Sequence, residues 1–255
     1  MAIIAVLNAQ PGVGTTTTAL NLLAAIAQRG QRPLGIDLDP AGDLTSVFGA
    51  RPEHAADSVF AFLRNHEPLG NVAQITRSGI VLCPAHADLA RLDAELGKGI
   101  DAVTRLRRAL RRPNAVTGPV VIDCGPRLDV LALNALFACE LLLVPVAADE
   151  GAVQAAERVE RAAAALEPVL KGRLARRYLR TRSCDSPADE EGGAGSRLAA
   201  AIPAGMLCRT RIRERPEVGE SRVAGLDVFR HAPGSAGAED YLALVDELAG
   251  AGFLA

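Results

Sequence analysis

The stretch AIIAVLNAQPGVGTTTTALNLLAAIAQRG, residues 2–30, decides the fold class. Its opening, residues 2–8, is a short apolar run rich in β-branched residues, which is typical of a buried strand. Residues 16–30 place apolar side chains at helical spacing, which predicts a helix. The Gly/Thr loop between them contains Gly12 and Gly14, which permit backbone torsions that other residues resist.

Such a loop between a strand and a helix is suited to phosphate. Consecutive backbone N–H groups at a helix N-terminus point into one concavity, and the helix dipole favours an anion there. A hydroxyl from Thr16 or Thr17 would be available to Mg²⁺. The alternative is a tight turn in which the threonines only cap the helix.

Further strand-like segments alternate with helical ones along the chain. The strands are expected at residues 33–40, 120–125, 140–149 and 176–181. The helices are expected at residues 57–64, 86–95, 100–112, 128–138, 151–167 and 240–252. Continuous apolar strands in this alternation predict an α/β fold, with a mostly parallel twisted sheet and helices on both faces. We expect a single domain over residues 1–255, with the polar, Gly-rich residues 183–197 as a surface loop.

The composition excludes several classes of protein. Of the 255 residues, 49% are apolar and 23% charged, so wholesale disorder is excluded. No apolar run reaches the ~18 residues of a membrane span, and the N-terminus lacks the basic region of a signal peptide. We therefore expect a soluble, cytoplasmic protein with no transmembrane segment. The five cysteines are odd in number and lack CxxC spacing, so they are expected to be buried thiols.

Carboxylates gather at the ends of two predicted strands. Asp37 and Asp39 alternate at the end of one strand, Asp43 follows in the loop, and Asp123 closes the strand at residues 120–125. Because parallel strands present their carboxyl ends at one edge of a sheet, these side chains are expected to converge on the Gly/Thr loop. They suit a hard cation and its waters. The alternative is that they only cap their own loops.

Taken together, these segments resemble the ParA/MinD family of deviant Walker A P-loop ATPases, of the SIMIBI class. The matching segments are QPGVGTT (10–16), TTTALNLLAAIAQRG (16–30), IDLDPAGDLTSVFG (36–49), VVIDCGPRLDVLALNAL (120–136), LLLVPVAADEGAVQA (141–155), RIRERPEVGESRVAG (211–225) and APGSAGAEDYLALVDEL (232–248). They cover nearly the whole chain in the family's order. The resemblance implies a P-loop NTPase that binds ATP or ADP with Mg²⁺ and forms a homodimer with nucleotide at the interface.

The resemblance also implies roles for individual residues. Nucleotide would be bound by the loop residues Gln10, Pro11, Gly12, Val13, Gly14, Thr15, Thr16 and Thr17. The metal would be held by Thr16, Asp39 and Asp123, and Asp39 would also be the catalytic carboxylate that helps to activate water. The switch segments would include Asp43, Gly125 and Pro126, and Asn134 matches an asparagine of the second-switch helix.

The departures from the family pattern concern charge. Thr15 stands in place of the Walker lysine, Gln10 in place of the signature lysine, and Pro11 in place of a glycine. Loss of a preorganised charge at such a site costs on the order of 10²–10³ in rate, so losing two should nearly abolish hydrolysis. The sequence thus predicts a degenerate ATPase. Arg127, just past the second switch, is a candidate replacement cation.

Clusters of arginine suggest a second ligand. In the family alignment Arg211 takes the place of an arginine associated with non-specific DNA binding, and Arg213 lies beside it. Arginines bind backbone phosphate without reading bases. The alternative is a solvated surface in an arginine-rich chain.

Three functions remain open from the sequence. The first is a ParA-like partitioning or spatial-organisation protein with an adaptor or cargo partner, on the nucleoid or recruited to the inner membrane. The second is an accessory scaffold of a cellulose-secretion or other envelope machine, similar to BcsQ, whose loop also reads GVGTT, or to CpaE-type proteins. The third is an enzyme of the wider family, an amide ligase or a reductase subunit, for which Cys83 and Cys124 would be the cluster ligands.

Overall fold

The computed structural model describes residues 2–97, 99–112, 116–147, 149–170, 172–183, 202–203 and 205–254. Within these ranges, eight strands form one sheet in the order β3-β4-β2-β5-β1-β6-β7-β8. The strands are β1 (Ile3–Val6), β2 (Leu34–Asp37), β3 (Gln74–Ile75), β4 (Val81–Cys83), β5 (Val120–Asp123), β6 (Leu141–Ala147), β7 (Ala175–Ser183) and β8 (Leu207–Arg213). Neighbouring strands are parallel, except that the short β3 pairs antiparallel with β4.

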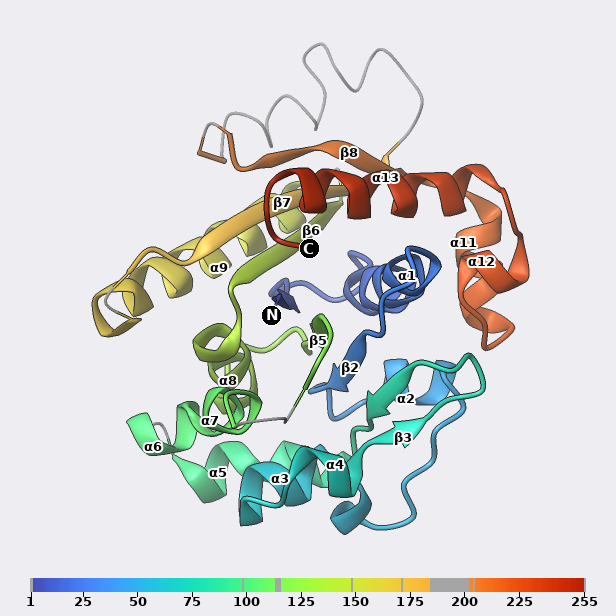
Figure 1. The fold of residues 1–255 in the computed structure, drawn as a ribbon. Helices are drawn as coiled ribbons and strands as arrows, with labels where there is room; N and C mark the ends of the chain where they lie inside the picture. The colour runs from blue at the N-terminus through green and yellow to red at the C-terminus, as the bar shows by residue number, and fades with distance from the viewer. Residues whose placement is uncertain are drawn as a thin grey trace.

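Helices cover both faces of this sheet. They are α1 (Thr15–Gln28), α2 (Asp43–Val47), η1 (Ala55–Asp57), α3 (Val59–Asn65), α4 (Leu69–Val72), η2 (Ala87–Arg91), α5 (Leu92–Leu96), α6 (Ile100–Val103), α7 (Arg105–Leu110), α8 (Val130–Ala138), α9 (Glu150–Leu170), α11 (Pro216–Val223), α12 (Val228–His231) and α13 (Ala236–Gly250). Figure 1 shows α1 and α13 on one side of the sheet and α8 and α9 on the other.

The central strands are buried on both faces, as their unbroken apolar sequences predict. In β1, Ile3 and Ala5 join the core beneath α8 and α9, while Ile4 and Val6 join the core beneath α1 and α13. This alternation follows from the two-residue repeat of a strand. The predicted fold class, a mostly parallel α/β sheet with helices on both faces, is confirmed.

The sequence prediction misses the edge strand β8. Its sequence, LCRTRIR, carries arginines at alternating positions and does not have the apolar character of a buried parallel strand. The strand is instead protected along its outer edge by α13. The backbone N–H groups of Arg209 and Thr210 donate to Glu247, and that of Arg213 donates to Asp240. Carboxylates thus occupy donors that would otherwise be open to another chain.

Smaller corrections concern element boundaries. The single helix predicted at 100–112 is two helices, α6 and α7, which break at Thr104. Helix α13 starts at Ala236, because Ser235 caps its N-terminus. The loop predicted at 183–197 lies, apart from Ser183, outside the described residues. Among the helices described, none is both long and apolar enough to cross a membrane.

Candidate functional site

The loop between β1 and α1 lies at the carboxyl edge of the sheet, beside the central strands. Gly12 has φ 80° and Gly14 has φ 92°, so both adopt the left-handed backbone that glycine permits. Gly14 is also the N-cap of α1. The side chain of Val13, between the two glycines, is fully buried and anchors the loop in the core.

The N-terminus of α1 is open. No side chain caps it and no acidic residue lies in its first turn, whereas α8 and α13 are capped by Asp129 and Ser235. The first backbone bond of α1 runs from the Thr18 N–H to the Gly14 carbonyl. Within the described ranges, the backbone N–H groups of residues 12–17 donate to no protein acceptor. Six adjacent unpaired donors at a helix start form an anion cradle.

The polar side chains of Asn8 and Gln10 fix the beginning of the loop. The fully buried Asn8 donates to the Pro145 carbonyl over 2.6 Å and accepts the Gln10 backbone N–H over 3.1 Å. The Gln10 side chain donates to Asp149 Oδ1 over 3.2 Å, and Asp149 also accepts the Ala152 N–H. Sequence analysis missed Asn8. The signal was an asparagine directly after a buried strand, where its side chain readily bonds the backbone two residues on.

Asp37 organises the segment that carries Asp39. Its Oδ1 accepts the Asp39 backbone N–H over 3.0 Å, and its Oδ2 accepts the Thr45 N–H over 2.9 Å and the Thr45 hydroxyl over 2.6 Å. Burial raises the pKa of Asp37 to about 7, against the lowering effect of these hydrogen bonds. The role of Asp37 in the structure is thus to shape the loop from β2 to α2.

Asp123 is a buried carboxylate at the edge of the sheet. It ends β5, in register with Val6 of β1 and Asp37 of β2, and is fully buried. Neither carboxylate oxygen accepts a hydrogen bond of normal geometry from the described residues. Burial, with the charge of Asp37, raises the pKa of Asp123 well above its usual value, and the Thr16 hydroxyl opposes this shift. A buried carboxylate without donors is costly unless a cation compensates it.

These residues fit a metal ion that is bound jointly by the protein, by phosphate oxygens and by water, rather than by protein ligands alone. In the described part of the chain, no group of three or more His, Cys, Asp or Glu side chains is arranged to hold a metal. Mg²⁺ commonly takes only one or two carboxylates and completes its shell with waters and phosphate oxygens. The orphaned carboxylate of Asp123 beside the open amides fits such an ion.

Asp39 and Gly125 lie close together at the edge of the sheet. A Cβ on Gly125 would lie 3.0 Å from Asp39 Oδ1, and Oδ1 also accepts the Ala41 N–H over 3.0 Å. With Pro126 and Arg127, the two residues line a small cleft. The Arg127 side chain is 77% exposed and pairs with Asp129 at 3.6 Å. Asp43, the first residue of α2, forms an ion pair with Arg222 of α11.

Asn134, which the resemblance places in the second-switch helix, binds backbone groups of neighbouring helices. Asn134 is fully buried in α8, donates to the Ala102 and Val130 carbonyls, and accepts the Leu106 N–H. It therefore holds the junction of α6 and α7 against α8. Cys83 and Cys124 are buried free thiols whose pKa burial raises, to about 12 for Cys83, which disfavours the thiolate that a metal cluster needs.

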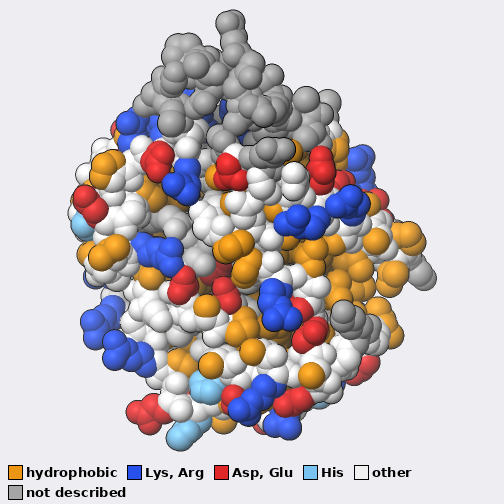
Figure 2. All heavy atoms as spheres, turned by 180° about the vertical axis from the view of Figure 1, so that it is seen from behind, with side chains coloured by type: hydrophobic (Ala, Val, Ile, Leu, Met, Phe, Trp, Pro, Cys, Tyr) orange, Lys and Arg blue, Asp and Glu red, His pale blue; other side chains and the backbone are white. Residues whose placement is uncertain are grey.

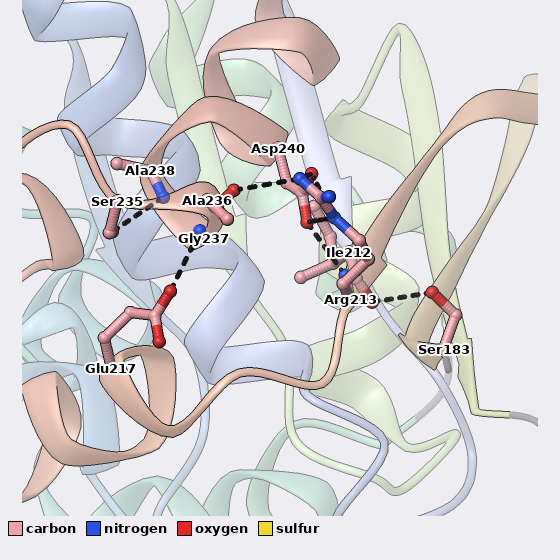
Figure 3. Close-up of polar contacts among 9 residues, drawn as sticks. All are labelled: Ser183, Ile212, Arg213, Glu217, Ser235, Ala236, Gly237, Ala238 and Asp240. Carbon is pink, nitrogen blue, oxygen red and sulfur yellow. Dashed lines mark hydrogen bonds and ion pairs between the residues drawn. The ribbon is translucent and has the colours of Figure 1, made fainter. Parts of the chain in front are cut away.

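The two arginines expected to bind DNA differ in their surroundings. Figure 3 shows the Arg213 guanidinium directed at Asp240, with bonds of 3.0 and 2.7 Å to Oδ1. Arg211 lies beside Arg180 of the neighbouring strand β7. On the face drawn in Figure 2, Lys and Arg side chains are interspersed with Asp and Glu side chains rather than gathered in one basic field.

Comparison with known proteins identifies the family. The model of the AAA domain family AAA_31 matches residues 1–174. The chain is 35% identical over 254 residues to the chromosome-partitioning ATPase Soj of Thermus thermophilus, covering 96% of this chain and 94% of Soj. It is 36% identical over 176 residues to the chromosome partitioning protein ParA of Caulobacter vibrioides, covering 66% of each, so the match spans slightly under two thirds of that ParA.

A solved structure resembles the whole fold. It is cobyrinic acid a,c-diamide synthase from Mycobacterium smegmatis with bound ADP and magnesium, at TM-score 0.79 and 26% identity, covering 96% of this chain and 93% of that one. Fold and open loop thus define a P-loop α/β protein. The chain belongs to the AAA domain family, and to its ParA/MinD type of P-loop ATPase. The expected ATP or ADP with Mg²⁺ agrees with the ligands of the mycobacterial enzyme.

Proposed function

We propose that this chain is a ParA-like partitioning or spatial-organisation protein that binds Mg-ATP as a dimerisation switch, with little or no hydrolysis. The observation that carries the proposal is the run of six unpaired backbone N–H groups at residues 12–17 next to the orphaned carboxylate of Asp123. The first group suits phosphate oxygens, and the second suits the magnesium ion that accompanies them.

Each part of the site has a proposed role. Residues Gln10 to Thr17 bind the phosphates, and Thr16, Asp39 and Asp123 hold the metal, which would neutralise phosphate charge. Asp39 is the catalytic carboxylate of whatever turnover remains, and its position close to Gly125 brings the two switch segments together. Asp43 and Pro126 belong to the same switches. In such a site, positioning and charge supply most of the catalysis.

Weak hydrolysis follows from the missing cations. No lysine occurs in residues 8–18. Gln10, where the family resemblance expects one of the two lysines, holds Asp149 with an uncharged amide. Arg127 is paired with Asp129. Without a lysine in the loop to balance the charge that develops on the phosphates during transfer, a bound triphosphate would persist.

The wider biological proposal is homodimerisation, non-specific DNA binding through Arg211 and Arg213, and an adaptor or cargo partner. It is supported by the partitioning proteins among the relatives. We also propose a single domain over residues 1–255, because strands from both ends of the chain share one sheet. The proposed location is the cytoplasm, on the nucleoid or recruited to the inner membrane by a partner.

Calorimetric titration with ATP and ADP, with and without Mg²⁺, tests the nucleotide switch, with light scattering for oligomeric state. We expect Mg-ATP to bind and to drive dimerisation. Asp123→Asn should lose most of the Mg²⁺-dependent part of the affinity, whereas the exposed control Asp57→Asn should bind as the wild type does. Failure of the wild type to bind either nucleotide would overturn the proposal and would favour a role as a scaffold.

Duplex DNA binding at two salt concentrations tests the second ligand. We expect Arg211→Ala to weaken binding and to reduce its salt dependence, because each lost phosphate contact lowers the slope by about one. Arg91→Ala, at a 70% exposed side chain on η2, is the control. Binding by the wild type that is absent, or independent of salt, would end the DNA proposal.

A scaffold of an envelope machine is the second candidate. The observation in its favour is the loop sequence GVGTT, residues 12–16, which has threonine where the family resemblance expects lysine. A scaffold of this kind would be held in one nucleotide state, or would bind none. Dimerisation that does not respond to nucleotide would favour this function over the partitioning switch.

A further inference from the structure

A side chain from the far end of the chain touches the phosphate loop. Thr181, near the end of strand β7, donates its hydroxyl to the Val13 carbonyl over 2.7 Å. The two residues are 168 positions apart in the sequence. The threonine is only 4% exposed. A Cβ added at Gly14 would lie 3.9 Å from its methyl carbon, so the threonine also borders the loop at Gly14.

This contact controls the direction of the loop's peptide groups. None of the described peptide bonds is cis, so the carbonyl of Val13 and the N–H of Gly14 point in opposite directions. Holding the carbonyl toward β7 therefore turns the Gly14 N–H away from Thr181. That N–H is one of the six unpaired donors at residues 12–17. The Thr181 hydroxyl thus fixes the orientation of the Gly14 N–H, a donor that is available to a ligand.

The end of β7 is itself held in place. The register of β7 against β8 shifts between Arg180 and Ser183, and Arg182 within this irregularity has φ 51°. Ser183 donates its hydroxyl to the Ile212 carbonyl of β8, and its own carbonyl accepts the N–H of Glu214, directly after that strand. Irregularities of this kind re-aim side chains at sheet ends. Thr181 therefore contacts the loop from a segment that hydrogen bonds hold in place.

We propose that Thr181 is a positioning residue of the phosphate loop: its hydroxyl orders residues 12–15 before a nucleoside triphosphate binds. The inference rests on the proposed nucleotide role of that loop. Thr181 touches the loop and need not touch the ligand. Its contribution is to keep the amide donors oriented, which saves the ordering that binding would otherwise require.

The test compares Thr181→Val, which keeps the shape and loses the donor, with Thr181→Ser, which keeps the donor. A matched control is Thr76→Val, because the Thr76 hydroxyl donates to the Ile80 carbonyl over 2.8 Å in the distant β3–β4 hairpin. The readouts are Mg-ATP affinity by calorimetry and backbone amide order parameters of residues 12–15 in the nucleotide-free protein. Thr181→Ala serves if the valine variant does not fold.

We expect Thr181→Val to weaken Mg-ATP affinity about five- to tenfold, the effect of one lost hydrogen bond, and to lower the order parameters of residues 12–15. Thr181→Ser and Thr76→Val should leave both near the wild-type values. Unchanged order parameters in Thr181→Val would overturn the inference. If the wild type binds no nucleotide, the proposed function fails, and the order parameters alone decide whether Thr181 positions the loop.

Discussion

Asp240 on α13 holds Arg213 of β8 through both its backbone and its side chain. Its carboxylate accepts the Arg213 backbone N–H over 2.9 Å and the Arg213 Nη2 over 2.7 Å, while Nη2 also lies 3.4 Å from the Ala236 carbonyl. Next to it, Glu217 accepts the Gly237 N–H at the start of α13 (Figure 3). The arginine that sequence assigned to DNA thus joins the edge strand to its covering helix.

This pairing predicts a stability role for Arg213. Its side chain is 27% exposed and that of Asp240 10%, so removal leaves a largely buried carboxylate with fewer donors. We expect Arg213→Ala to lower the free energy of unfolding by about 1–3 kcal/mol, measured by urea denaturation. Arg209→Ala, at a 91% exposed side chain, should change it by less than about 0.5 kcal/mol. Equal stability of the two variants would contradict this role.

The buried aspartates predict how stability depends on pH. Burial raises the pKa of Asp37 to about 7 and moves that of Asp123 in the same direction. Between the normal pKa of each aspartate and its raised pKa, which is about 7 for Asp37, the folded protein therefore retains a proton that the unfolded chain has released. The contribution of these groups to stability is full below their normal pKa and is lost as the pH rises through the raised pKa, which is about 7 for Asp37. We expect the urea midpoint without Mg²⁺ to fall over this window.

The same reasoning predicts a stabilising substitution. Asp123→Asn removes a buried charge that accepts no hydrogen bond of normal geometry from the described residues, and should raise the free energy of unfolding at pH 8 by about 1–2 kcal/mol. The gain should shrink as the pH falls toward the normal pKa of aspartate, because the raised pKa lets the folded protein hold a proton on Asp123. Asp57→Asn, on an exposed turn, is the control. A variant less stable than the wild type at pH 8 would mean that Asp123 has a compensating partner.

A substitution at Gly125 should change Mg-ATP affinity with little change in stability. In Gly125→Ala, the new Cβ would lie 3.0 Å from Asp39 Oδ1 and 3.1 Å from Cγ, so the half-exposed carboxylate must move by a few tenths of an ångström. We expect stability within about 1 kcal/mol of the wild type but a several-fold loss of Mg-ATP affinity. Gly70→Ala has open space around it and is the matched control. Wild-type affinity in Gly125→Ala would mean that Asp39 does not need its present position.

The sequence was informative where local pattern and position in the fold agree. The buried strands β1, β2, β5 and β6 and the helix α1 follow from apolar runs and spacing, and parallel order then places Asp37 and Asp123 at one edge. Residues whose role depends on distant partners were not predictable in this way. Thr181 meets Val13 only because β7 lies beside β6, and nothing in RTRS, residues 180–183, signals it.

The roles of some residues stayed open from the sequence because their hydrogen-bonding partners lie on distant elements. The sequence offers Arg213 as a phosphate-binding arginine but does not show that α13 brings Asp240 against it. Asn134 looks like a switch residue until α6 and α7 supply the backbone groups that it binds. In both cases the residue type was read correctly as hydrogen bonding, but its partner lies on an element that local pattern cannot place.

Restoring a lysine gives the most direct prediction about turnover. Thr15 is the first residue of α1, directly after the open Gly14 cap. A lysine there would bring a fixed cation to the cradle, where it would stabilise the charge that develops on the transferring phosphoryl group. We expect Thr15→Lys to raise phosphate release by about 10²–10³-fold over the wild type. The cost is small, about 0.5 kcal/mol of stability from a cation at a helix N-terminus.

The control for this experiment is Thr15→Lys combined with Asp39→Ala, which should return phosphate release to the background and so exclude a contaminating ATPase. Wild-type hydrolysis as fast as that of Thr15→Lys would show that the chain turns over ATP without the lysine. Tight Mg-ATP binding by Thr15→Lys with no gain in rate would mean instead that Asp39 and the switch segments no longer support hydrolysis, and that the missing lysine is not what limits it.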